Sequence, residues 1–253
     1  TVTHPPTSAL SATSGTFSTT LASTGNATIG ASSAPSLWSS SNNFVISDTS
    51  SDGGMAILSG TSGNGNVMFS DTTAGAFSDA RGLITYLHAS DDMRFMTANT
   101  EHMRINSTGA VTMPLQPAFL AKVNTDQTNI ATNTDVAVLF NVERFDQNAD
   151  FDTGTYTFTA PVTGRYQLET SLRLENVDTA GGYYQLKLVT SNVTYATLIS
   201  PLFTADASYW NLSHAVLADM DASDTAIVKI KQLQGTAQTD IDIESYFSGY
   251  LVC

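Results

Sequence analysis

The chain has 253 residues, a formal net charge of −13 and a charged fraction of only 13%. Its 10 basic residues form no cluster, which argues against nucleic acid as a partner and against an anionic membrane surface. No apolar stretch approaches the ~20 residues of a membrane span, so no membrane insertion is expected. Hydrophobic residues make up 42% of the chain, enough for a core, and the single cysteine, Cys253, excludes an internal disulfide framework.

Residues 1–24 form a first segment that is rich in Ser and Thr, almost uncharged and poor in apolar residues. Such a segment has too little apolar surface to fold alone. We expect an extended N-terminal arm that is ordered only beside sister chains. Because the chain begins at Thr1 rather than Met, we also expect it to be a fragment or a processed product.

Residues 25–117 carry short apolar segments that are separated by Gly, Asn and Asp roughly every ten residues. Six of these segments have the length of a strand: 44–46, 55–58, 67–69, 83–87, 93–96 and 102–105. None shows the sustained period of an amphipathic helix. The pattern predicts an extended, β-rich module.

Residues 118–253 have a denser strand pattern. Residues 165–175 alternate, with Tyr166, Leu168, Thr170, Leu172 and Leu174 on one face, as in a half-buried antiparallel strand. The other predicted strands are 118–123, 136–142, 156–159, 183–190, 194–200, 208–218, 226–233 and 241–252. About ten strands without helices predict an all-β sandwich or jelly roll.

An aromatic and glycine signature crosses this last region, and the turn 159–166 and the final strand 246–251 continue it. The signature residues are Phe140, Asp146, Phe151, Phe158, Gly164 and Tyr166. In these residues and their spacing the region resembles the globular head of the complement C-one-q family, a relative of the tumour-necrosis-factor jelly roll. The resemblance implies a jelly-roll head that assembles as a trimer.

The middle region also carries a recognisable set of segments, at 82–88, 91–95, 101–106 and 109–111. In these segments it is similar to a module common in bacteriophage tail and neck fibres. Such proteins often end in a self-cleaving chaperone, but nothing after Pro117 resembles one. That activity is therefore not expected here.

Together the two resemblances imply a virion surface fibre protein, tail or neck, that is assembled in the host cytoplasm. We expect a homotrimer with an arm at 1–24, a shaft module at 25–117 and a head at 118–253. The arm would contact other virion proteins, and the head would attach to a host surface glycan or protein. A purely structural capsid-decorating or neck fibre, with the head as a trimerisation domain, is the alternative. A capsule depolymerase is a further one.

No catalytic residues are predicted. His88 with Asp91 and Asp92 could form an acid–base group, but pairing of these acids with Arg94 or Arg104 is the simpler interpretation. His214 is expected to be a packed or interface histidine rather than a ligand. A depolymerase would need a carboxylate pair in a cleft, which a sequence cannot show.

No cofactor is predicted, and calcium remains open without assigned ligands. Residues 219–224 resemble the start of a calcium loop but lack its glycine and its final glutamate, so an acidic turn is expected. Residues 240–244 place three carboxylates on one strand face. If this strand pairs with 226–233 as a hairpin, Lys229 and Lys231 would form cross-strand ion pairs with them.

Aromatic residues supply the remaining candidates. The pairs Tyr183–Tyr184 and Tyr209–Trp210 place adjacent rings on opposite strand faces, so one ring of each pair should face outward or into a subunit interface. These four residues are the receptor-contact candidates. The core is expected to contain Phe140, Phe151, Phe158, Tyr166, Leu172 and Phe247.

Overall fold

The computed structural model describes residues 27–30, 44–47, 55–71 and 80–253. Its chain divides into two units, Thr1–Ser59 and Gly60–Cys253. In the first unit, β1 (Ala27–Gly30) pairs in parallel with β2 (Phe44–Ser47). All regular structure in the described residues is β, and none of it is a helix that could cross a membrane. The arm predicted at 1–24 lies outside the described residues.

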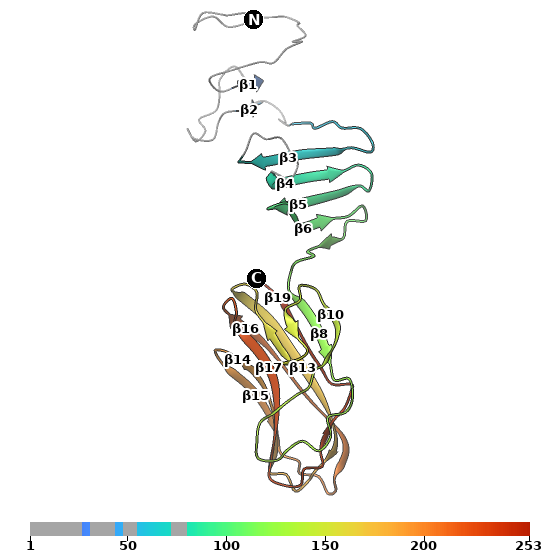
Figure 1. The fold of residues 1–253 in the computed structure, drawn as a ribbon, viewed down its shortest axis with the longest axis vertical. Helices are drawn as coiled ribbons and strands as arrows, with labels where there is room; N and C mark the ends of the chain where they lie inside the picture. Colours follow the sequence, from blue (N-terminus) through green and yellow to red (C-terminus); the bar gives the residue numbers. More distant parts are fainter. Residues whose placement is uncertain (1–26, 31–43, 48–54, 72–79) are drawn as a thin grey trace, which may run out of the picture. The chain divides into compact units, whose positions relative to one another are not determined.

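The second unit begins with a five-stranded antiparallel sheet, here called the meander sheet (Figure 1). Its strands follow one another in chain order: β3 (Asn64–Ser70), β4 (Ala80–Leu87), β5 (Asp92–Thr97), β6 (Thr100–Ile105) and β7 (Val111–Thr112). Ala98 and Asn99 between β5 and β6 both have positive φ, which is the geometry of a tight hairpin. The strand segments predicted here are confirmed except 55–58, which is not a strand.

The remainder is a sandwich of two six-stranded sheets. The first, here the β13 sheet, has the order β10-β8-β19-β13-β16, and β18 also pairs with β13. Its strands are β8 (Ala118–Lys122), β10 (Val142–Asp146), β13 (Gly164–Val177), β16 (Ala207–Met220), β18 (Asp240–Ile241) and β19 (Tyr246–Leu251).

The second, here the β14 sheet, has the order β11-β12-β17-β14-β15, and β9 also pairs with β17. Its strands are β9 (Val136–Ala137), β11 (Phe151–Asp152), β12 (Thr157–Thr159), β14 (Tyr183–Thr190), β15 (Thr194–Ile199) and β17 (Thr225–Leu233). The predicted all-β jelly roll is confirmed. Two predicted strands differ in extent: 136–142 is a strand only at β9, and 241–252 divides into β18 and β19. The strands β10 and β11 were not predicted.

One apolar core lies between the two sheets. The predicted alternation in β13 is confirmed, because its inward row from Tyr166 to Leu174 is fully buried. Phe119 is the centre of an aromatic cluster in which its ring is 4.9 Å from Phe158 and 5.0 Å from both Phe151 and Phe247. All six predicted core residues belong to this core: Phe140, Phe151, Phe158, Tyr166, Leu172 and Phe247.

The hairpin considered between 226–233 and 240–244 does not form. β17 lies in the β14 sheet between β12 and β14, whereas β18 and β19 both pair with β13 in the opposite sheet. Consecutive strands of a jelly roll cross from one sheet to the other, so neighbours in sequence are not neighbours in the sheet. The carboxylates of 240–244 therefore find other partners than Lys229 and Lys231.

Candidate functional site

The outer face of the β13 sheet carries an unusual amount of apolar surface. Two rows of directly paired residues cross this face, one from β10 to β16 and the other from β8 to β16. One row is Phe145, Leu120, Ser248, Glu169 and Ala215; the other is Ala118, Tyr250, Gln167 and Leu217. Phe145, Tyr250 and Leu217 are each 52% exposed. A sheet face that meets only water usually carries polar residues at such positions.

A hollow of about 420 Å³ lies in the same face. Leu120, Phe145 and Tyr250 form its apolar wall, and Gln167 and Glu169 contribute its polar groups. Sequence reasoning missed this surface, because Leu120 lies within a continuous apolar run and Phe145 within a short strand. The alternation of Tyr246, Ser248 and Tyr250 was the available signal. We refer below to Leu120, Phe145, Tyr250 and Leu217 as the apolar patch of the head.

Charged groups occupy a different part of this face. The Arg173 guanidinium lies 2.6 Å from Asp242 and 5.7 Å from the ring centroid of Tyr209. The hydrogen bond to Asp242 raises the pKa of Arg173. Burial opposes ionisation of Asp242, but hydrogen bonds from Arg173 and the Glu244 amide outweigh burial and lower the pKa of Asp242. The pKa of Glu175 is raised, first by its hydrogen bond with Asp242. These charges are thus largely paired within one chain.

The outer face of the β14 sheet is different. β9 pairs with β17 within this sheet, and Asp135 lies directly before β9. Lys187 reaches from β14 to Asp135, with Nζ 2.7 Å from the carboxylate. Leu198 on the edge strand β15 is an exposed apolar side chain on this face. The apolar patch therefore distinguishes one side of the sandwich from the other.

Of the four receptor-contact candidates, Tyr184 does not lie on the surface of the chain. Its side chain is fully buried, and its hydroxyl lies 2.7 Å from the Thr239 hydroxyl and accepts a hydrogen bond from the Asp178 amide. Burial raises the pKa of Tyr184. Tyr183 points to the opposite, outer face of the β14 sheet and is half-buried. Period-two alternation predicted that one ring would face outward but could not say which.

Tyr209 and Trp210 are both exposed, at 62% and 38%. Tyr209 lies on the outer face of the β13 sheet, over Arg173. Trp210 lies on the other side of the same strand, where its ring packs on Phe203 with 4.9 Å between centroids. Leu202, next to Phe203, is almost fully exposed. The structure thus separates the two rings onto two surfaces, and it adds Leu202 and Phe203 to the second.

The histidine and carboxylate groups considered for catalysis form no acid–base pair. Asp92 lies 2.9 Å from Arg104 and 3.6 Å from Arg94, which confirms the ion-pair interpretation. Asp91 accepts a hydrogen bond from the hydroxyl of Tyr86, whose ring packs edge-on against His88.

His214 and the acidic turn complete the list of candidates. His214 lies in the inward row of β16, opposite buried Thr170, as expected for a packed histidine. Residues 221–224 form the turn between β16 and β17, closed by a hydrogen bond from the Asp224 amide to the Asp221 carbonyl. Within the described residues, no group of three or more His, Cys, Asp or Glu side chains is arranged to hold a metal ion.

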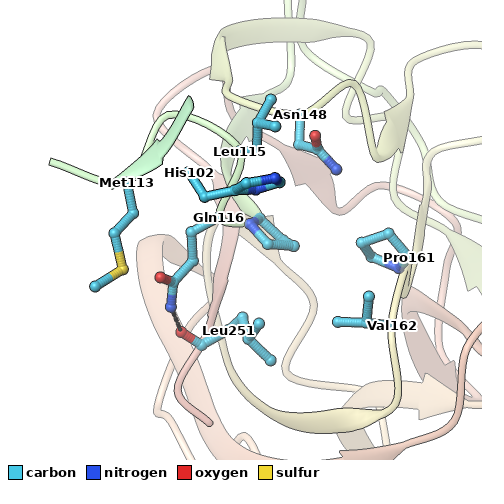
Figure 2. Close-up of a pocket in the computed structure, with 9 residues that line it drawn as sticks. His102, Met113, Leu115, Gln116, Asn148, Pro161, Val162 and Leu251 are labelled. Atoms are coloured by element: carbon cyan, nitrogen blue, oxygen red, sulfur yellow. Dashed lines mark hydrogen bonds between the residues drawn. The ribbon is translucent and has the colours of Figure 1, made fainter. Parts of the chain in front are cut away.

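The segment between β7 and β8 is anchored to the head. A hollow of about 340 Å³ lies at this place. Figure 2 shows the residues that line it, with Gln116 donating a hydrogen bond to the Leu251 carbonyl. The Gln147 side chain donates to the carbonyls of Met113 and Gln116, at 2.7 and 2.9 Å. These three hydrogen bonds tie residues 113–116 to the last strand and to the loop after β10.

Comparison with known proteins shows which protein family the head resembles. A family model of the C1q domain matches residues 118–252. The solved globular domain of zebrafish complement 1qA protein is 22% identical, with a TM-score of 0.42, and the match covers 55% of this chain and 98% of that chain. Two structures of murine APRIL are 9% identical, with TM-scores of 0.40 and 0.41, and the matches cover 54% of this chain and 99% of those chains. No curated protein sequence matches the chain. Because the C1q model covers more than half of its residues, the chain belongs to the C1q domain family.

Proposed function

We propose that this protein is a homotrimeric virion surface fibre whose C1q-type head attaches the particle to a host cell. C1q-like domains commonly trimerise, and members of the family are typically ligand-binding proteins rather than enzymes. The observation that carries the proposal is the apolar patch of the head, which a single chain leaves in water. Trimerisation through this face would bury it, and three heads would give avidity for a weakly bound surface ligand.

The fibre part of the proposal has separate support. The segments of 82–111 that resemble a phage fibre module correspond to β4–β7 of the meander sheet and the turns between them, directly before the head. A trimeric head then presents its free surfaces outward. Trp210 with Phe203, and Tyr183 on the other sheet, are the receptor-contact candidates that such a trimer leaves available. Tyr209 lies on the association face instead.

Native mass tests the association. Light scattering of the whole chain should give three times the 26.8 kDa of one chain. Phe145→Glu places a carboxylate within the apolar patch and should yield monomers, because an unpaired charge is costly to bury. Leu198→Glu is the matched control, since Leu198 is equally half-exposed on the opposite sheet, and it should stay trimeric. A monomeric parent, or a trimeric Phe145→Glu variant, would contradict trimerisation through the apolar patch.

A purely structural role, in which the head only drives trimerisation, is separated from attachment by cell binding. The labelled trimer should bind cells of at least one strain in a bacterial panel, and Trp210→Ala should weaken that binding. Val193→Ala, which changes an exposed side chain in the turn after β14, should leave the binding unchanged. A confirmed trimer that binds no strain would favour the structural role. Release of sugar from capsule would instead favour the depolymerase.

A further inference from the structure

The meander sheet is a single layer, and one of its faces, here called the apolar face, carries two rows of apolar side chains. Register places Val67, Ile84, Phe95 and Met103 in one row across β3 to β6. The next row on the same side contains Tyr86, Met93, Ile105 and Val111. Ile84, Phe69 and Val111 are exposed, and a hollow of about 350 Å³ between Phe69, Ile84 and Phe95 opens on this side. A sheet with an apolar face needs a second layer against it. An uncovered sheet buries too little apolar surface to offset the conformational entropy that its strands lose on folding.

The opposite face of the meander sheet carries a cluster of ion pairs. Arg104 lies 2.9 Å from Asp92 and 2.8 Å from Glu101, and Arg94 lies 3.3 Å from Glu101. The two cations and two anions neutralise one another within one chain. The hydroxyl of Thr85, next along the same face, donates to Asn66. The same face also carries the row Met68, Leu83 and Met96, of which Leu83 is buried and Met68 is exposed. More exposed apolar side chains lie on the other face, so that is the side where a second layer is expected.

The connection to the head limits which partner can reach that face. Five residues, 113–117, separate β7 from β8, so the end of the meander sheet lies within about 20 Å of the start of the head. The hydrogen bonds of Gln116 and Gln147 hold residues 113–116 on the head, which further limits the distance between the head and the meander sheet. β8 also carries Leu120 of the apolar patch. When three heads associate through that patch, three meander sheets are held at high effective concentration.

We propose that the apolar face of the meander sheet is a second association surface, which packs against the same face of two further copies of this chain. The inference rests on the homotrimer of the proposed function and adds where the shaft is held together. Three sheets of this kind would enclose one shared core built from the row Val67, Ile84, Phe95 and Met103. The ion-paired faces would point outward.

Interchain disulfides test this surface. In a Cys253→Ser background, which removes the one native thiol, single cysteines replace Ile84, Phe95 or Met103 in turn. Met68→Cys is the matched control, because Met68 lies on the opposite face of the same sheet and is 48% exposed, against 37% for Ile84. Each variant is checked for native mass by light scattering, then oxidised mildly and run on a non-reducing gel. A disulfide needs Cβ atoms about 4 Å apart, so only faces that meet can form one.

The expected result is a trimer in which at least one of the three positions yields disulfide-linked dimers at tenfold or more the level of Met68→Cys. A trimer without such a product at all three positions overturns the inference, because the face is then free or covered by another segment of its own chain. In that case the homotrimer itself still stands. A monomeric mass overturns both the second association surface and the homotrimer. Ile84→Cys changes an already exposed side chain, so one of the three variants keeps the fold.

Discussion

Phe158 is a core position of the head where the cost of truncation can be worked out from its contacts. Its side chain is fully buried in β12, with its ring 4.9 Å from Phe119 at an interplanar angle of 15° and 5.4 Å from Tyr166. Burying a phenylalanine removes about 150–250 Å² from water, which at ~25 cal/mol per Å² is an upper estimate of about 4–6 kcal/mol. Alanine retains a small part of that burial. Because stiff aromatic neighbours on both sides cannot close the cavity, we expect Phe158→Ala to destabilise the head by about 3–5 kcal/mol.

Urea unfolding at fixed chain concentration measures this change, since the stability of an oligomer depends on concentration. The midpoint should fall without a large change in the slope, which reports the surface exposed on unfolding. Val193→Ala in the exposed turn after β14 is the control and should stay within about 0.5 kcal/mol of the parent. A Phe158→Ala variant that loses less than about 1 kcal/mol would contradict the placement of this ring in the packed core.

Three further changes test other parts of the structure. Gly249→Ala should destabilise the head by about 1–3 kcal/mol in urea, because the added Cβ would lie 2.6 Å from a methyl of Leu168; an unchanged midpoint would refute this close approach. Tyr166→Phe removes a 2.7 Å hydrogen bond to a backbone carbonyl and should cost about 0.5–1.5 kcal/mol, so equal stability would show that the bond contributes nothing. Glu101→Gln should lower the melting temperature at pH 7, since the hydrogen bond from Arg104 lowers the pKa of Glu101 in the folded chain. That contribution is present above the ordinary pKa of 4.5 and is lost as the pH falls through the lower folded value, so the difference from the parent should shrink at pH 3 and a constant difference would be evidence against it.

The meander sheet shows how far short strand signals can be followed. Apolar segments of three to five residues between turn residues predicted β3 to β6 within a few residues. The segment 55–58 has the same composition but is not a strand, because strand formation needs a hydrogen-bonded neighbour as well as propensity. Its apolar side chains are exposed instead.

In the head, alternation and aromatic spacing determined the core. The period-two pattern of β13 identified its buried row, and the spaced aromatics Phe151, Phe158 and Tyr166 were core residues as expected. These signals are local, because each depends only on which side of one strand is apolar. They specify that a sandwich forms and which side chains fill it.

The pairing of strands and the identity of the surfaces were decided by the tertiary structure. Asp242 met Arg173 on β13 rather than a lysine of β17, because the chain crosses between sheets after β17. Tyr184 was buried and Tyr183 was not, although the two are adjacent, because the core lies on one side of β14 only. Phe145 and Tyr250, far apart in sequence, came together as the apolar patch through the neighbours β10, β8 and β19. The sequence by itself thus determined the fold class and the core, since these follow from local periodicity. Which residues share a surface depends on long-range strand order, and no local pattern encodes that order.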